Sequence, residues 1–130
     1  MRADVDGLQA LLETRGFRGG WTRAFRNDTQ DVVLVATYEF ASPEQADLYL
    51  QDGLITVGGY GGELFDIVEL PGTHSFRQTS ADASGPLVTH GVTFTQGNRW
   101  YLLFILGDPE TATVDIVVEA TRQQMAALRP

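Results

Sequence analysis

The chain has 130 residues, a net charge of −8, nine basic residues that are all arginine, and no cysteine. A chain of this length can bury roughly two-thirds of its unfolded surface, so we expect one domain over residues 1–130 without a disulfide or metal staple. The missing cysteine and lysine exclude thiol nucleophiles, cysteine-based zinc sites, Schiff-base chemistry and the P-loop lysine. The acidic balance argues against nucleic-acid binding.

The N-terminal third predicts a helix followed by a β-hairpin. Leucines at helical spacing indicate a short amphipathic helix from Asp4 or Asp6 to the terminating glycine Gly16. Residues 21–26 and 32–40 alternate or run apolar around a polar turn, as the two strands of a hairpin do.

A second helix is predicted after Ser42, with Ser42 as N-cap, Pro43 in the first turn and Gln45 completing a capping box. We expect it to end near Gly53. The glycine-rich segment 58–62 is expected to form a mobile loop, because glycine loses the most backbone entropy in regular structure. Its spacing matches no phosphate-binding motif.

The C-terminal half predicts further strands and a last helix. Residues 79–85 look like a polar loop, and a Gly97-Asn98 pair suits a tight hairpin turn. The segment Trp100–Leu106 is apolar on both faces, which is typical of a central strand. Asp108-Pro109-Glu110 is expected to begin the last helix. Strands are expected over residues 64–70, 74–78, 87–95 and 99–106.

These elements predict an α+β domain in which an antiparallel sheet of five to six strands is flanked by about three helices. The longest apolar run, Trp100–Leu106, is far shorter than the ~20 residues of a membrane-spanning helix. We therefore expect no transmembrane segment in this chain.

The two histidines are the candidates for acid–base or metal chemistry. His90 should be half-buried and hydrogen-bonded on an apolar strand face, and His74 should face solvent after a turn. The spacing does not show either one converging with Asp66 or Glu69, and Ser75 beside His74 forms no nucleophile–base pair because adjacent strand residues point to opposite faces. No catalytic residue, metal or cofactor is predicted.

Aromatic residues and arginines interleave in the first hairpin. They could form a cationic, aromatic surface for an anionic ligand or a lipid headgroup. The alternative is that Trp21 and Phe25 fill the core while the arginines offset the acidic segment 27–76. The residues concerned are Phe17, Trp21 and Phe25 with Arg15, Arg18, Arg23 and Arg26.

A set of motifs resembles a known group of proteins: Gly16-Phe17, Gly20, Arg23 and Phe25; Phe40-Ala41-Ser42 with Ala46 and Tyr49; Leu70-Pro71-Gly72; and Val92-Thr93-Phe94 through Gly97. The pattern resembles actinobacterial cell-envelope lipoprotein and secreted domains of unknown function, of LpqN type with a PsbP-like fold. The resemblance implies an extracytoplasmic setting and a binding role without a catalytic centre. This chain shows neither the lipidated cysteine nor the signal peptide of such proteins.

The sequence therefore predicts a non-enzymatic binding or interaction domain of the bacterial cell envelope, with a protein, a lipid or a small anionic ligand as partner. The candidate binding residues are Trp21, Arg23, Arg26, His90 and Tyr60. One alternative is a small ligand-binding or hydrolytic protein with a pocket between helix and sheet, roofed by the glycine loop and polarised by His90 and Glu39. Another is a cytoplasmic partner-binding domain.

Overall fold

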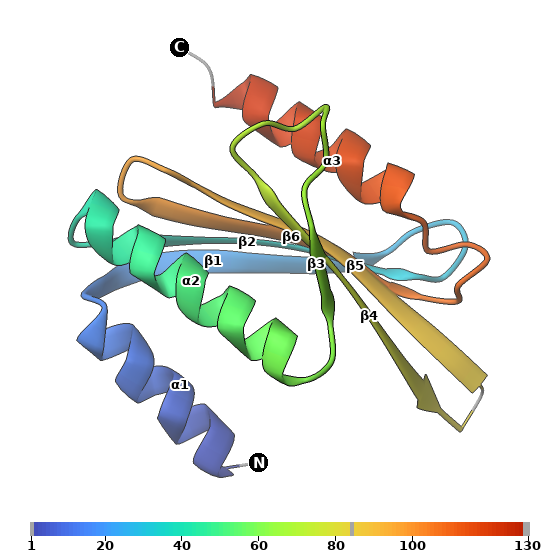
Figure 1. Cartoon of the computed structure of the whole chain (residues 1–130), viewed down its shortest axis with the longest axis horizontal. Coiled ribbons are helices and arrows are strands. Elements are labelled where there is room, and N and C mark those ends of the chain that lie inside the picture. The colour runs from blue at the N-terminus through green and yellow to red at the C-terminus, as the bar shows by residue number, and fades with distance from the viewer. Residues whose placement is uncertain (1, 84, 129–130) are drawn as a thin grey trace.

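The computed structural model describes residues 2–83 and 85–128, which form three helices and six strands (Figure 1). The predicted α+β class is confirmed. The elements in chain order are α1 (Arg2–Thr14), β1 (Phe17–Arg26), β2 (Val32–Phe40), α2 (Pro43–Gly59), β3 (Glu63–Phe65), β4 (His74–Asp82), β5 (Gly85–Gln96), β6 (Arg99–Gly107) and α3 (Val114–Ala127).

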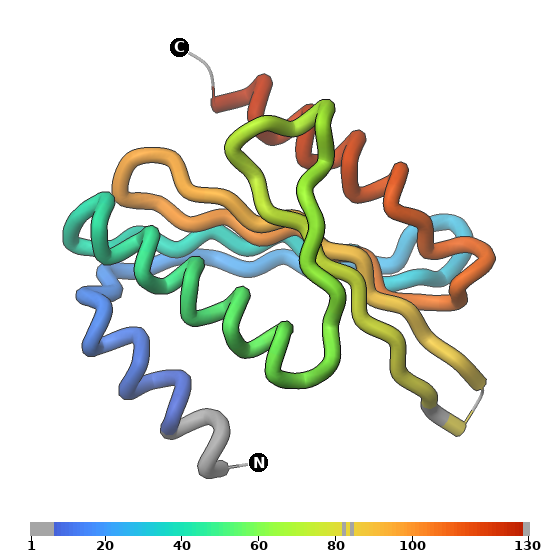
Figure 2. The backbone as a smooth tube through the Cα atoms, viewed as in Figure 1, coloured from blue at the N-terminus to red at the C-terminus, as the bar shows by residue number. Residues whose placement is uncertain are grey.

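The strands make one antiparallel sheet in the order β1-β2-β6-β5-β4-β3. The predicted central strand is confirmed, because β6 lies between β2 and β5 and both of its faces are covered. Helices α2 and α3 pack on opposite faces of the sheet, and the backbone trace shows the sheet passing between them (Figure 2). We call these two faces the α2 face and the α3 face.

Each face has its own core, as the alternation of side chains along a strand requires. On the α3 face, Leu103 and Ile105 of β6 pack with Val117 of α3. On the α2 face, Trp100 of β6 packs with Leu50 of α2 and with an aromatic cluster in which the Trp100 and Tyr49 rings are 4.9 Å apart. The other rings of this cluster are Phe17, Tyr38 and Phe40.

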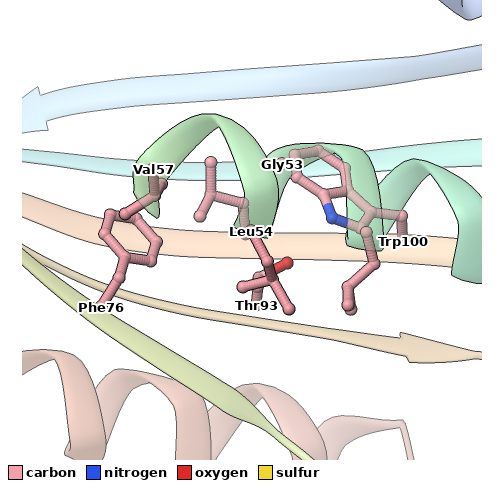
Figure 3. A pocket seen from close by; sticks show the side chains of 8 residues that line it. Gly53, Leu54, Val57, Phe76, Thr93 and Trp100 are labelled. Carbon is pink, nitrogen blue, oxygen red and sulfur yellow. The ribbon is translucent and has the colours of Figure 1, made fainter. Parts of the chain in front are cut away.

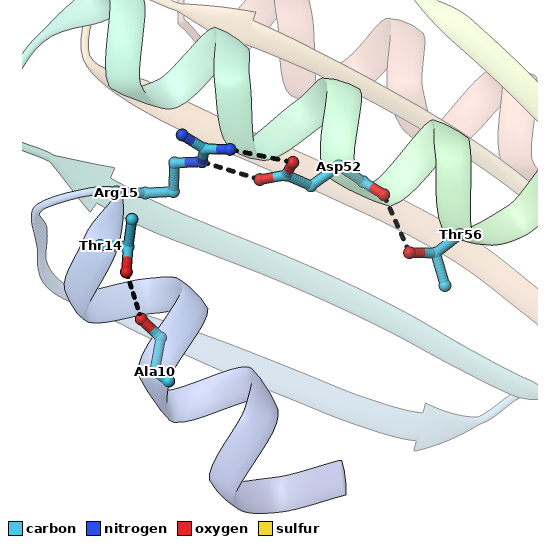
Figure 4. Close-up of polar contacts among 5 residues, drawn as sticks. All are labelled: Ala10, Thr14, Arg15, Asp52 and Thr56. Atoms are coloured by element: carbon cyan, nitrogen blue, oxygen red, sulfur yellow. Dashed lines mark hydrogen bonds and ion pairs between the residues drawn. The ribbon is translucent and has the colours of Figure 1, made fainter.

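Helix α1 lies beside α2, and Arg15, the residue that directly follows α1, forms an ion pair with Asp52 of α2 (Figure 4). The Arg15 guanidinium donates two hydrogen bonds to the Asp52 carboxylate, at 2.8 and 3.1 Å. This bidentate geometry is the strong form of an arginine–carboxylate contact. One of the arginines of the predicted cationic surface is therefore used in holding two helices together.

The first half of the chain has its predicted elements, but several boundaries differ. The prediction that Asp4 or Asp6 begins the first helix is wrong, because α1 begins at Arg2, and β1 begins at Phe17 rather than at residue 21. The hairpin of β1 and β2 is confirmed, and the Ser42 Oγ accepts the N-cap hydrogen bond from the Gln45 N–H. The prediction that Gln45 completes a capping box is wrong, because its Oε1 has no hydrogen-bond partner among the described residues. The predicted end near Gly53 is wrong, and so is the assignment of residues 58 and 59 to a loop, because α2 continues to Gly59. Leu54 and Val57 pack against the sheet and so extend the helix past its glycine.

Three further boundaries differ from the predictions. Strand β3 ends at Phe65, because residues 66–73 form turns that place Leu70 in the α3-face core. The expected loop 79–85 is largely a ladder, since β4 and β5 pair as far as their tips. Helix α3 begins only at Val114, because the Asp108 carbonyl accepts from the backbone of residues 111 and 112 in a separate turn that contains Pro109.

A buried carboxylate joins the β1–β2 turn to the segment before α3. Asp31 is 3 % exposed and accepts hydrogen bonds from the hydroxyls of Thr29 and Thr111 and from the Asp108 N–H. Burial opposes ionisation of this group, but the hydrogen bonds outweigh burial and lower the Asp31 pKa. The contacts of Asp31 are thus those of a structural anchor.

Candidate functional site

An aromatic and cationic surface lies on β1, the outer strand of the sheet. Trp21 is 51 % exposed and Phe25 is 46 % exposed. Both are on the α3 face, as their partners Thr37 and Val33 show, and the Arg23 guanidinium between them lies 5.8 Å from the Phe25 ring centroid. The alternative that Trp21 and Phe25 fill the core is wrong, because α3 packs on β5 and β6 and leaves this part of the sheet uncovered.

A hollow of about 300 Å³ adjoins Trp21. Thr37 is 8 % exposed, and its Oγ1 has no hydrogen-bond partner among the described residues. Glu39 and Arg99 form an ion pair of 3.5 Å at the same hollow. The hollow is lined by Gly19, Gly20, Trp21, Thr37, Glu39 and Arg99.

Gly20 is required beside this hollow by the close approach of β1 to β2. A Cβ at this position would lie 2.3 Å from the Thr37 carbonyl oxygen and 2.7 Å from a ring carbon of Tyr38. Such distances are well inside van der Waals contact. Gly20 therefore allows β1 to lie close to β2 where Trp21 pairs with Thr37 in the sheet register.

The remaining arginines of the hairpin take different positions. Arg18 is exposed on β1, whereas Arg26 lies on the α2 face and donates to the Gln30 carbonyl at 2.8 Å. Of the predicted site residues, Trp21 and Arg23 thus share one surface, and Arg26 belongs to the same strand but to its other face. We call Arg18, Trp21, Arg23 and Phe25 the β1 surface.

His90 lies away from the β1 surface. It is half-buried on the α3 face of β5, as predicted, and its neighbours in register are Arg77 and Ile105. The prediction that His90 is hydrogen-bonded is wrong for its Nδ1, which has no hydrogen-bond partner within the described part of the chain. Burial, followed by the charge of Arg77, lowers the His90 pKa. Strands β2 and β6 separate this histidine from β1.

Tyr60 is also separate from the β1 surface. It follows the C-terminal end of α2 and is 77 % exposed. Its carbonyl accepts a long hydrogen bond of 3.5 Å from the Gln78 side chain of β4. The structure therefore divides the five predicted binding residues among at least three places.

A cavity of about 100 Å³ lies between α2 and the sheet (Figure 3). It has the position that the alternative hypothesis gave to a pocket. The prediction that His90 and Glu39 polarise this pocket is wrong, however, because both residues lie on the α3 face, as their register shows. The residues around the cavity are Leu50, Gly53, Leu54, Val57, Phe76, Thr93, Trp100 and Leu102.

A second hollow, at the end of β3, brings together two polar residues whose convergence the sequence did not show, and Leu64, Phe65 and Ser75 complete its lining. His74 is half-buried rather than solvent-facing, and it lines a hollow of about 180 Å³ together with Asp66 and Leu54. Only the register of β3, β4 and β5 reveals this proximity, because eight positions separate the two polar residues in the sequence. No cluster of three or more potential metal ligands occurs within residues 2–83 and 85–128.

No family model and no curated protein matches this chain. Among solved structures, the chain is similar to the extracellular domain of PknH from Mycobacterium tuberculosis, with a TM-score of 0.54 and 15 % sequence identity. The match covers 76 % of this chain and 59 % of the PknH domain, so the chain spans little more than half the length of that neighbour. No helix in the described part of the chain is long and apolar enough to cross a membrane. At this level of identity the likeness to PknH is one of fold.

Proposed function

We propose that this chain is a non-enzymatic interaction domain on the extracytoplasmic side of a bacterial cell envelope, and that its β1 surface docks an extended acidic segment of a partner protein. The observation that carries the proposal is the exposure of Trp21 and Phe25 around Arg23 on an outer strand. The fold shared with an extracellular bacterial domain supports the setting.

The aromatic residues supply the apolar part of the docking surface. Tryptophan, tyrosine and arginine dominate the binding energy of protein interfaces because they offer large, rigid or planar contact areas. Trp21 and Phe25 keep about half of their surfaces in water, where their burial by a partner gives a free-energy gain. The adjoining hollow can receive one partner side chain, which would also give the Thr37 hydroxyl a hydrogen-bond partner.

The positive charge of β1 favours a partner of negative charge. Residues 17–26 contain three arginines and no acid, although the whole chain carries a net charge of −8. An acidic partner is attracted to this strand and repelled by most of the remaining surface, so the contrast in charge orients the partner as well as binding it.

The position of β1 favours an extended partner. Among the described strands, β1 pairs with β2 alone, so its outer backbone groups are available for another strand. Adding a strand to such an edge combines backbone hydrogen bonds with side-chain contacts at alternate positions. Trp21, Arg23 and Phe25 occupy alternate positions on one face, as this mode of binding requires.

The test uses a ten-residue peptide that alternates glutamate with valine, and a second peptide with lysine in place of glutamate. The two tryptophan indole N–H resonances in a ¹H–¹⁵N spectrum are assigned with the Trp21→Phe variant. We expect the acidic peptide to shift the Trp21 indole and the backbone amides of residues 18–26, and the lysine peptide to leave them unchanged.

The variants Trp21→Ala and Arg23→Ala should each weaken the acidic peptide at least fivefold. Arg122→Ala removes an exposed arginine of α3 and is the matched control. Equal binding of the two peptides, no shift at millimolar peptide, or an unchanged affinity of Arg23→Ala would each overturn the proposal.

A further inference from the structure

We propose that the α2 face carries a second, independent binding site, for a small amphiphile with an aliphatic tail and an amine head. The tail would occupy the apolar cavity under α2, and the head would lie in the adjoining hollow of Asp66 and His74. This site shares no residue with the β1 surface, so the two proposals stand or fall separately.

The cavity and the hollow are adjacent. Leu54 of α2 lines both of them. His74 of the hollow and Thr93 of the cavity are direct partners in the antiparallel register of β4 and β5, and both lie on the α2 face. Direct partners of this kind have Cβ atoms about 5 Å apart. One molecule a few bonds long can therefore reach from the cavity to the hollow.

The cavity suits a short aliphatic chain. Its wall is formed largely by carbon atoms of Leu50, Leu54, Phe76 and Leu102. The Thr93 hydroxyl already donates to the Tyr101 carbonyl at 2.8 Å, so it does not need a hydrogen-bond acceptor from the ligand. An apolar cavity of about 150 Å³ can take up benzene, and a volume of about 100 Å³ corresponds to a smaller group or a chain of a few methylenes.

Gly53 is exposed and lies at the rim of the cavity. It lies within α2, and a Cβ built there would meet nothing within 4 Å. Glycine in a helix interior is destabilising by about 0.5–1 kcal/mol relative to alanine, so no packing constraint at this position explains its presence. The missing side chain at position 53 leaves the entrance to the cavity open for a ligand.

The surroundings of the hollow favour a cationic head. Asp66 supplies a carboxylate that can accept charge-assisted hydrogen bonds, and the His74 ring adds a nitrogen at the same hollow. Residues 27–76 contain nine acids and no arginine. The next arginine, Arg77, lies on the α3 face of β4, opposite His90, and contacts Glu63 at 3.8 Å. A carboxylate head would therefore meet like charge, whereas an amine meets opposite charge.

The test compares three compounds with the same six-carbon tail: n-hexylamine, 1-hexanol and hexanoate, at pH 8 and up to 10 mM. Binding is followed by the indole N–H resonance of Trp100, which lines the cavity. We expect hexylamine to shift this resonance with at least fivefold higher affinity than hexanol, and hexanoate to bind more weakly than both. The Trp21 indole, on the β1 surface, should not move.

Two variants separate the tail from the head. Gly53→Leu places a side chain at the cavity and should abolish the shifts caused by both hexylamine and hexanol, while the helix gains propensity. Asp66→Asn should reduce the affinity for hexylamine at least fivefold and leave that for hexanol unchanged. Asp28→Asn removes an exposed acid from the β1–β2 turn and is the control.

No shift of the Trp100 resonance by any of the three compounds would overturn the proposal. Equal affinities for the amine and the carboxylate would do the same, and so would an unaltered affinity of Asp66→Asn for hexylamine. A failure of the acidic peptide to bind β1 has no bearing on these outcomes, because that experiment reads the other tryptophan.

Discussion

Gly91 shows how one residue sets the packing of the α2 face. The Phe76 ring of β4 lies directly over Gly91 of β5, and a Cβ at position 91 would approach the ring to 2.1 Å. We therefore expect Gly91→Ala to lower the free energy of unfolding by about 1–3 kcal/mol, the range for overpacking a core. Gly53→Ala is the matched control and should raise it by about 0.5–1 kcal/mol, because its Cβ meets open space. Urea denaturation followed by circular dichroism measures both, and equal effects of the two variants would contradict this account of Phe76.

Tyr49 gives the aromatic cluster a pH dependence in alkaline solution. Burial, then the neighbouring Tyr38 and Asp52, raises the Tyr49 pKa to about 12, compared with about 10 for an unperturbed tyrosine. The Tyr49 pKa is higher in the folded chain than in the unfolded chain. The contribution of Tyr49 to the free energy of unfolding is therefore complete below pH ~10 and is lost as the pH rises toward 12. The chain has no lysine to titrate in this window.

We expect the urea midpoint of the wild type to fall between pH 10 and 12, and Tyr49→Phe to reduce this fall, because phenylalanine has no proton to lose. Tyr60→Phe is the control, since Tyr60 is 77 % exposed. A fall in Tyr49→Phe as steep as in the wild type would show that another group causes the alkaline loss.

At the scale of elements, local signals predicted the kind of each helix, one helix cap and the tight turns, whereas the starts of α1, β1 and α3 and the end of α2 lie elsewhere than predicted. The Ser42 cap, the first hairpin and the Gly97 turn are each specified by a few adjacent residues, and all three are present. The end of α2 depends instead on Leu54 and Val57 meeting the sheet. Intrinsic propensity is a weak guide wherever such tertiary contacts compete with it.

The candidate sites also depend partly on local sequence signals and partly on long-range packing. The sequence identified Trp21 and Arg23 as neighbours on one strand face, because alternation along a strand is a local property. It could not show that β1 is an outer strand beyond the reach of α3, and so it left the core interpretation of Trp21 open. It also could not pair His74 with Thr93, because their proximity comes from the β4–β5 register, and these residues are 19 positions apart.

At the scale of the whole molecule, the β1 surface raises the question of what prevents two copies from joining edge to edge. Exposed edge strands with apolar side chains tend to pair with other chains, and charged residues commonly protect them. On β1, Arg18 and Arg23 are charged residues that lie near Trp21 and Phe25 in the strand, where they can protect the edge. Two copies of β1 brought together would set arginine near arginine, which opposes pairing, whereas an acidic partner would relieve the same repulsion.

Replacing Arg18 and Arg23 by threonine should therefore increase self-association, measured as a concentration-dependent rise in sedimentation coefficient between 0.05 and about 1 mM protein, a range in which weak edge pairing is populated. The change also takes the net charge from −8 to −10, which increases general repulsion. At 0.15 M salt that repulsion is screened beyond about 8 Å, so the local loss of the two cations at the edge should prevail. The double variant Arg77→Thr/Arg122→Thr, with both changes away from β1, has the same net charge of −10 and is the control for net charge. Sedimentation of the double variant like that of the wild type would mean that the arginines of β1 do not guard its edge and leave partner binding as their role.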